Sequence, residues 1–184
     1  MERHEPKSGD RRLITERLTL REPQPDDLPP YRLVVVGEDE AERELRYGLA
    51  HWRAHGFGPW IVEEAGRTVG VLEVHFAGPG VAGIAPDEVE VGWTIVESER
   101  RRGYAFEAAR AAIEDAFERL RPPWIVAYIR PGNAISIRLA EHLGFGHVAD
   151  GLTRSGDPTR IYRRKRPRSP QRQMGAQSGP SDLR

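Results

Sequence analysis

Apolar and polar side chains alternate along several stretches of the chain, which is the pattern of β-strands with one buried face. The clearest stretch is residues 87–97, where Val89, Val91, Trp93 and Ile95 occupy every second position. Alternation or short apolar runs predict further strands at residues 13–22, 57–64, 68–76, 124–129, 145–151 and 159–164. A glycine-containing turn at residues 65–67 would join two of these strands as a hairpin.

A helical period of apolar side chains follows the clearest strand. Its buried stripe would consist of Ala105, Ala108, Ala109, Ala112, Ile113, Ala116, Phe117 and Leu120. The same period predicts helices at residues 38–55 and about 133–143, and a short one starting near Pro29. Mostly antiparallel strands precede the long helix and a strand-helix-strand unit follows it, so we expect an α+β fold with a mixed sheet flanked by helices.

Length and composition limit the function classes. The 184 residues suffice for one domain, and a formal net charge of +0 argues against a dedicated nucleic-acid binder. The absence of cysteine excludes disulfides, thiol nucleophiles and thiolate metal sites. Since no apolar run approaches the roughly 20 residues of a membrane span, a soluble cytoplasmic protein without membrane contact is expected.

The polar ends of the chain flank this domain. Residues 1–12 are charged and without period, so they predict a flexible tail, and the domain would span residues 13–164. Residues 165–184 are rich in Arg, Pro, Ser, Gln and Gly and predict a disordered basic and polar tail. The basic run at 163–168 also admits a nucleic-acid or ribosome contact, although a solvated charge run is the commoner meaning.

The turn between the clearest strand and the long helix carries the first candidate chemistry. It reads Arg100-Arg101-Arg102-Gly103-Tyr104-Ala105. A helix that starts here leaves its first N–H groups without partners and presents the positive end of its dipole. Gly103 lets the backbone approach a ligand, so the turn predicts a phosphate or pyrophosphate site. An arginine-rich turn that merely caps a surface helix is the alternative.

Three blocks in this order resemble one family. The first, Arg100-x-x-Gly103-x-Ala105, fits the [QR]-x-x-G-x-[GA] acetyl-coenzyme A loop of the GCN5-related N-acetyltransferases (GNAT superfamily). Asn133-Ala134-Ile135-Ser136 with the later Leu-Gly-Phe at 143–145 resembles a segment of the RimJ/RimL-type branch, and residues 15–21 resemble its N-terminal strand. The resemblance covers about residues 13–164.

This resemblance implies a fold and an activity. The GNAT-like sheet would have six to seven strands, with 87–97 and 124–129 splaying apart around the pantetheine arm. The protein would transfer an acetyl group from acetyl-CoA to a primary amine by direct attack in a ternary complex. Its cofactor contacts would be Ile95, Val96, Arg100, Arg101, Arg102, Gly103, Tyr104, Ala105, Asn133 and Ser136. A non-catalytic GNAT-like module that binds acyl-CoA or a protein is the alternative.

The reaction needs a polarised carbonyl and a neutral amine. In the family a backbone N–H at about Thr94 or Ile95 would stabilise the oxyanion. Polar side chains on these strands are the candidates for the base, and the Glu90 carboxylate comes first. Glu88, Glu73 and His75 are further candidate residues of the acceptor site. Alternating polar residues on a half-solvated sheet also occur without any function.

The reaction also needs a proton for the leaving thiolate. Many members of the superfamily place a tyrosine four residues before the glycine of Leu-Gly-Phe, but Ala140 stands there. The RimJ/RimL-like branch offers Ser136 instead, one helical turn after Asn133. Ser136 has the alternative of an ordinary hydroxyl bonded to backbone, and Asn133 that of a pure N-cap.

The acceptor side is the least readable part of the sequence. By the resemblance, Trp52 and Trp60 border the acceptor pocket, although core packing explains them equally well. His51 and His55 have the i, i+4 spacing of a metal pair but lack a third ligand, so no metal is expected. The acceptor, whether a peptide N-terminus or a small-molecule amine, stays open, as does the oligomeric state, for which a homodimer is one option.

Overall fold

The computed structural model describes residues 11–167, which form eight strands and four α-helices. The strands are β1 (Arg12–Ile14), β2 (Thr19–Arg21), β3 (Trp60–Glu64), β4 (Arg67–Phe76), β5 (Val89–Ile95), β6 (Trp124–Ile129), β7 (Gly146–Leu152) and β8 (Pro158–Lys165). The helices are α1 (Leu28–Arg32), α2 (Glu38–His55), α3 (Tyr104–Arg119) and α4 (Ala134–His142). The predicted helix at 38–55 and strand at 124–129 are confirmed to the residue.

One mixed sheet contains all eight strands in the order β1-β2-β3-β4-β5-β6-β8-β7. Its neighbours are antiparallel except β5 and β6, so the predicted α+β class is confirmed. The sheet has one strand more than expected because the segment at 13–22 is a hairpin. The Thr15 N–H donates to the Leu18 carbonyl oxygen (2.9 Å), and the Thr15 hydroxyl accepts from the Leu18 N–H (2.9 Å). This side-chain turn reverses the chain.

The parallel pair β5 and β6 separates soon after it forms. The two strands are in register only at Val89 with Ile125 and at Glu90 with Val126. Beyond these positions β5 stays paired with β4 as far as Ile95, whereas β6 continues beside β8. The expected splaying is therefore present, and it leaves the far half of β5 without a neighbour on its β6 side.

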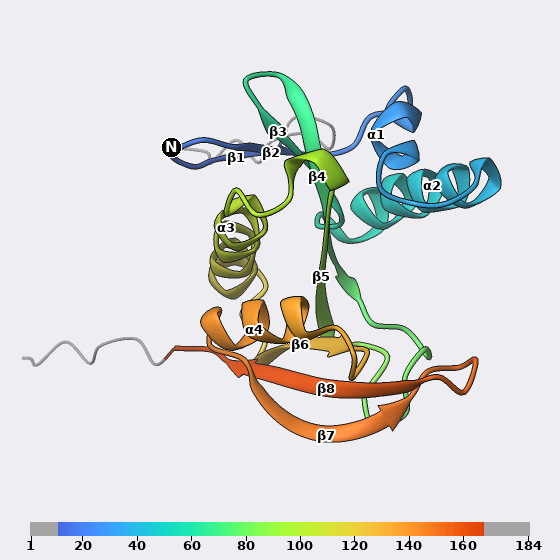
Figure 1. Ribbon diagram of the computed structural model, residues 1–184, viewed down its shortest axis with the longest axis vertical. Coiled ribbons are helices and arrows are strands. Elements are labelled where there is room, and N and C mark those ends of the chain that lie inside the picture. The colour runs from blue at the N-terminus through green and yellow to red at the C-terminus, as the bar shows by residue number, and fades with distance from the viewer. Residues whose placement is uncertain (1–10, 168–184) are drawn as a thin grey trace, which may run out of the picture.

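Helices cover both faces of the sheet. In Figure 1, α3 lies on one side of β4 and β5, and α1 and α2 lie on the other. The main core joins α3 and α4 to the strands and contains Ala108, Ala112 and Ile113 of the predicted helical stripe. A smaller core packs Tyr31 and Leu45, from α1 and α2, against Ile61 and Val71. The polar face of β4 and β5 therefore looks toward α1 and α2.

The predicted tails fall almost entirely on residues 1–10 and 168–184, outside the described part of the chain. Of the residues assigned to them, Arg12 begins β1 and Lys165 ends β8. The expected hairpin turn lies between β3 and β4, with positive φ angles at Ala65 (47°) and Gly66 (77°). Within 11–167, the helices are too short or too polar to cross a bilayer.

Candidate active site

The turn from β5 to α3 presents a series of unpaired backbone donors. A short 3₁₀ turn (Glu97–Glu99) leads into the arginines, and Gly103 takes a left-handed φ of 84° as the residue before α3. The N–H groups from Arg101 to Phe106 donate no hydrogen bond to any described residue. Because the helix dipole adds partial positive charge there, the turn has the donors and field that a phosphate group requires.

The three arginines of this turn differ in their surroundings. Arg101 is exposed and has no ion pair within the described chain, and Arg100 donates from Nε to the Ile95 carbonyl oxygen (3.2 Å). Arg102 is bound to the buried Glu99 (2.6 Å), which also binds Arg67. Arg100 and Arg101 are therefore the more available cations, whereas Arg102 would have to leave Glu99 to bind a ligand.

Tyr104 anchors the turn to the rest of the molecule. Its side chain is buried, its hydroxyl donates to Glu64, and the guanidinium groups of Arg17 and Arg102 lie over its ring, 5.0 Å and 5.2 Å from the centroid. As a cofactor contact, Tyr104 can therefore offer its backbone N–H but not its side chain.

Arg17 braces the same turn from the N-terminal hairpin. It donates to the Arg102 carbonyl oxygen (2.9 Å) and pairs with Glu107 in the first turn of α3 (2.6 Å). The sequence analysis placed Arg17 in a family-like block but gave it no role, because its partners lie about ninety positions away in the chain.

Strand pairing determines which backbone N–H groups of β5 face the gap toward β6. The Val96 N–H donates to the Val69 carbonyl oxygen (2.9 Å), and the backbone carbonyl oxygen of Glu88 accepts from the Ala77 N–H (2.9 Å). Hydrogen bonds alternate along an antiparallel strand, so Thr94 also turns its N–H toward β4. The N–H of Ile95 points into the gap toward β6. Strand pairing already uses the Val96 N–H, so a cofactor contact at Val96 would have to come from its carbonyl oxygen or its side chain.

Glu90 is the most unusual carboxyl group near this gap. It is 7% exposed and has no hydrogen-bond partner within residues 11–167, yet its oxygens are not sealed from solvent. Burial and the charge of Glu73 raise the pKa of Glu90 to about 8. A carboxyl group with such a pKa is mostly protonated at neutral pH and becomes available as a base for an amine proton as the pH rises toward 8.

Glu73 and His75 share the face of Glu90. His75 is directly opposite Glu90 in the register of β4 and β5, and Glu73 is opposite Gly92. Burial and the charge of Glu44 raise the pKa of Glu73 to about 7. Burial lowers the pKa of His75, whose Nδ1–H donates to the Phe76 carbonyl oxygen (2.8 Å) and leaves Nε2 4.0 Å from Glu73. Three of the predicted site residues are thus brought together.

Tyr128 joins this group without having been predicted. Val126 of β6 is in register with Glu90, so Tyr128, two residues later, has the same facing. The charge of Glu90, followed by burial, raises the pKa of Tyr128. Nothing in a short apolar strand distinguishes such a tyrosine, because its position relative to Glu90 depends on strand register.

The first turn of α4 lies beyond β6. The Asn133 side chain accepts from the Ser136 N–H (3.1 Å), which confirms the predicted N-cap. The Ser136 hydroxyl makes no hydrogen bond with the described residues, so its alternative role in bonding backbone has no support there. Ala140 is fully buried, as core packing requires.

Three predicted acceptor residues lie elsewhere. Trp52 and Trp60 are 3% and 1% exposed, and their rings pack edge to face with centroids 4.8 Å apart. The Trp52 indole N–H donates to the Pro59 carbonyl oxygen (2.7 Å). They belong to the core. The Glu88 carboxylate accepts hydrogen bonds from Arg163 (2.8 Å) and Trp124. Burial acts to raise the pKa of Glu88, but its hydrogen bonds outweigh burial and lower the pKa. Its carboxylate joins the start of β5 to β8. A contact of these three residues with the acceptor stays a prediction.

Hydrogen bonds occupy both ring nitrogens of His51, the first residue of the His51 and His55 pair. The Nδ1–H of His51 donates to the Phe57 carbonyl oxygen (2.7 Å), and its Nε2 accepts from the Phe76 N–H (3.2 Å). Both ring nitrogens are therefore used to attach α2 to β4. No group of three or more potential metal ligands is present within residues 11–167.

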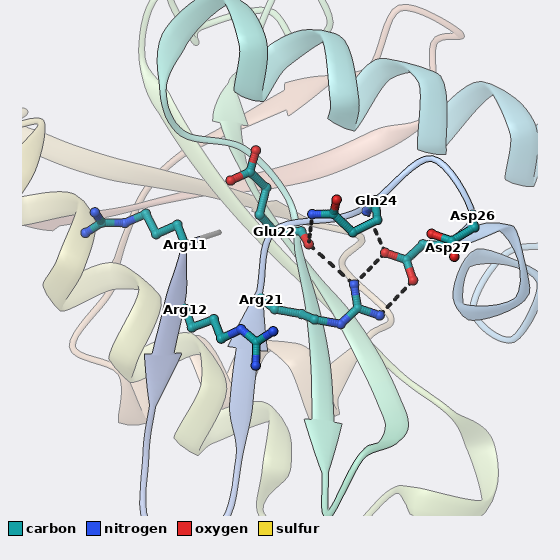
Figure 2. Close-up of a pocket in the computed structure, with 7 residues that line it drawn as sticks. All are labelled: Arg11, Arg12, Arg21, Glu22, Gln24, Asp26 and Asp27. Carbon is teal, nitrogen blue, oxygen red and sulfur yellow. Dashed lines mark hydrogen bonds and ion pairs between the residues drawn. The ribbon is translucent and has the colours of Figure 1, made fainter. Parts of the chain in front are cut away.

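A polar hollow of about 370 Å³ lies beside the N-terminal hairpin (Figure 2). Figure 2 shows the Arg21 guanidinium turned toward Asp27, to which it donates twice, and Arg21 also binds Glu63 (2.8 Å). The hollow is lined by Arg11, Arg12, Arg21, Glu22, Gln24, Asp26 and Asp27. Since Arg21 is already paired, we do not assign the active site to this hollow.

Comparison with known proteins gives the chain its family. The model of the acetyltransferase (GNAT) domain matches residues 17–146. YkkB of Bacillus subtilis (strain 168) is 32% identical over 145 residues, which cover 76% of this chain and 79% of YkkB.

Solved structures agree with this assignment. An acetyltransferase from Agrobacterium tumefaciens str. C58 is 31% identical, with a TM-score of 0.69 over 89% of this chain and 99% of its own. The ribosomal L7/L12 alpha-N-protein acetyltransferase RimL, solved with coenzyme A, shares the fold at 15% identity, with a TM-score of 0.68 over 83% and 96% of the two chains. The chain therefore belongs to the GNAT family and is an acetyl-CoA-dependent acetyltransferase.

Proposed function

We propose that this protein transfers the acetyl group of acetyl-CoA directly to a primary amine, with Glu90 as the general base. The observation that carries the proposal is the Glu90 carboxyl group, which is buried, has no hydrogen-bond partner within the described chain, and lies where β5 and β6 begin to separate. Strand pairing holds it on the same sheet as the Ile95 N–H, the candidate oxyanion donor.

The residues present fit acetyl-CoA. The N–H groups from Arg101 to Phe106 supply hydrogen bonds for a pyrophosphate, and Arg100 and Arg101 supply charge. The separation of β5 from β6 leaves backbone donors along β5 for an extended chain. The structure of RimL contains coenzyme A, which supports the same use of the fold here.

The proton balance of the proposed reaction is simple. The amine nitrogen attacks the thioester carbonyl carbon, and its proton passes to the Glu90 carboxylate directly or through water. The Ile95 N–H stabilises the charge that develops on the carbonyl oxygen. The carbon–sulfur bond then breaks, and the Ser136 hydroxyl supplies the thiolate with a proton that solvent replaces.

The first experiment is to measure the melting temperature with acetyl-CoA and with free CoA, using NAD and ATP as controls. A ligand at 100 times its dissociation constant stabilises a protein by about 2.7 kcal/mol, so a clear upward shift is expected with both CoA species. Thiol release with a panel of amines then tests transfer, and the chain's lack of cysteine keeps the background low. CoA binding without release from any amine would favour a non-catalytic acyl-CoA-binding module, and absence of binding would contradict both functions.

Ser136→Ala separates catalysis from binding. We expect kcat to fall about tenfold or more, within the range of general acid catalysis, because the thiolate loses its proton donor. The affinity for CoA should be nearly unchanged, since the Asn133 cap accepts from the Ser136 backbone and not from its hydroxyl. Steady-state kinetics and calorimetry measure the two effects, with Ser155→Ala in the turn between β7 and β8 as the matched control. An unchanged kcat would remove Ser136 from the mechanism.

A further inference from the structure

The peptide between Arg102 and Gly103 is flanked by two residues with left-handed backbone. Arg101 has a φ of 64° and Gly103 one of 84°. A residue with a side chain, such as Arg101, adopts this conformation only at an energetic cost, which the surrounding structure must offset. After Gly103 the backbone is fixed by α3, because the Glu107 N–H donates to the Gly103 carbonyl oxygen (3.1 Å). The peptide before Gly103 lies outside the helix and needs a different support.

Arg17 holds this peptide from the N-terminal hairpin. Its Nη1–H donates to the Arg102 carbonyl oxygen (2.9 Å), and its Nη2 would lie 3.2 Å from a Cβ added at Gly103. A trans peptide is planar, so its C=O and its N–H point in opposite directions. The bond from Arg17 therefore turns the Gly103 N–H away from the hairpin, and no described residue accepts that N–H.

Glu107, in the first turn of α3, fixes the Arg17 guanidinium in its turn. Its Oε2 accepts from Arg17 Nε (2.7 Å), and its Oε1 accepts from the Arg17 backbone N–H (2.9 Å). The Thr15 hydroxyl donates to the same Oε1 (2.6 Å), and the guanidinium lies 5.0 Å from the centroid of the Tyr104 ring. Charge-assisted hydrogen bonds of this kind are short and directional. They give Arg17 a defined orientation although 42% of its side chain is exposed.

We propose that Arg17 is a positioning residue for the cofactor, which orients the peptide between Arg102 and Gly103 so that the Gly103 N–H donates to the pyrophosphate of acetyl-CoA. This inference rests on the proposed function, because it deepens the use of the same turn as the pyrophosphate site. Nε, Nη1 and Nη2 of Arg17 already contact Glu107 or the Arg102 carbonyl oxygen. Arg17 therefore acts through the peptide and not by touching the ligand.

Arg17→Met tests the inference, because it removes the guanidinium and keeps most of the aliphatic stem. Calorimetry should show an affinity for CoA that is lower by about tenfold or more, the effect of misplacing one hydrogen bond to a charged group. Arg11→Met is the matched control. It removes another ion pair between the N-terminal segment and α3, that of Arg11 with Asp115 (2.6 Å), about two turns farther along the helix.

Both variants should lower the melting temperature, since each loses an ion pair to α3, but only Arg17→Met should lose affinity for CoA. An unchanged CoA affinity of Arg17→Met would overturn the inference. Equal losses of CoA affinity in Arg17→Met and Arg11→Met would overturn it as well, because attachment of the hairpin in general would then explain the effect.

Glu107→Ala distinguishes position from charge. This substitution removes a negative charge near the turn and releases Arg17, so electrostatic attraction alone would make CoA bind more tightly. We expect CoA to bind about threefold more weakly or worse, because the guanidinium loses the carboxylate that orients it. Unchanged or tighter binding of CoA by Glu107→Ala would overturn the positioning role of Arg17.

Steady-state kinetics provide a second readout. In the thiol-release assay, Arg17→Met should raise KM for acetyl-CoA about tenfold and leave kcat unchanged, because the reacting thioester lies at the other end of the cofactor. A lower kcat with an unchanged KM would contradict this role. Failure of the proposed function has a different signature, since the wild-type protein itself would then not bind CoA.

Discussion

Glu90→Gln is expected to lower kcat about 100-fold or more at pH 7 to 8, in line with the usual contribution of a general base. Glutamine preserves the shape of the side chain but cannot accept the proton of the attacking amine. The affinity for CoA should stay unchanged, because Glu90 lies within β5 and outside the turn from Arg100 to Ala105. Thiol-release kinetics and CoA calorimetry measure the two quantities, and Glu118→Gln controls for the loss of one surface carboxylate. Full activity of Glu90→Gln would contradict the proposed mechanism.

The pH dependence gives the same substitution a second readout. In the wild type, kcat/KM should rise with pH toward 8 as Glu90 ionises, whereas the variant should lack this component. The groups that share its surroundings are Glu73, His75, Tyr47 and Tyr128. Because several of these groups interact, the profile reports on the cluster and not on Glu90 alone.

The folding stability of the wild type should fall as pH rises, whereas its kcat/KM should rise. Burial and Glu73 raise the folded-state pKa of Glu90 above its unfolded value, so protonated Glu90 stabilises the fold below the unfolded pKa, and this contribution is lost as pH rises through about 8. Glutamine has no charge to bury. The melting temperature of Glu90→Gln, relative to that of the wild type, should therefore increase between pH 5 and pH 9. The corresponding difference in the free energy of unfolding should reach up to a few kcal/mol, at about 1.4 kcal/mol per pKa unit. A constant difference across this range would mean that the group titrates normally.

Gly103→Val is expected to weaken acetyl-CoA binding about 100-fold or more, since two or more charge-assisted hydrogen bonds would be misplaced. Gly103 has a φ of 84°, which a β-branched residue adopts only with strain. Its Cβ would lie 3.2 Å from a guanidinium nitrogen of Arg17, the side chain that braces the turn. The turn must then shift, and its N–H groups no longer converge. Calorimetry with acetyl-CoA measures the loss.

Gly66→Val separates backbone strain from loss of the site. Gly66 has a φ of 77° in the hairpin between β3 and β4, and nothing lies within 4 Å of the position of its Cβ. The two variants therefore carry similar backbone strain, of about 1–2 kcal/mol, and Gly103→Val should lower the melting temperature somewhat more because of its contact with Arg17. Only Gly103→Val should lose CoA affinity. Equal CoA affinities for both variants and the wild type would show that the turn at Gly103 does not hold the cofactor.

Local patterns predicted most of the elements and the turn that we propose to hold the cofactor. The alternation at 87–97 and the helical period after it gave β5, α3 and the turn between them, because both periods are set by backbone geometry within one segment. The hairpin at 13–22 was missed, since its reversal depends on one threonine side chain that binds nearby backbone. Asn133 and Gly103 were recognisable because capping and left-handed conformations restrict the residue type.

The acceptor side was decided by tertiary structure. The sequence determined that a basic, glycine-containing turn would join a half-buried strand to a helix, which is enough to indicate an anion site. It put Glu90 ahead of Glu73 and Glu88 as candidate base, but it described all three only as polar positions of strands. Only the assembled sheet pairs Glu88 with Arg163, leaves Glu90 without a hydrogen-bond partner in the described chain, and places His75 directly opposite Glu90. The reason is physical: periodicity fixes the facing of a side chain, whereas its neighbours, burial and pKa depend on segments distant in the chain.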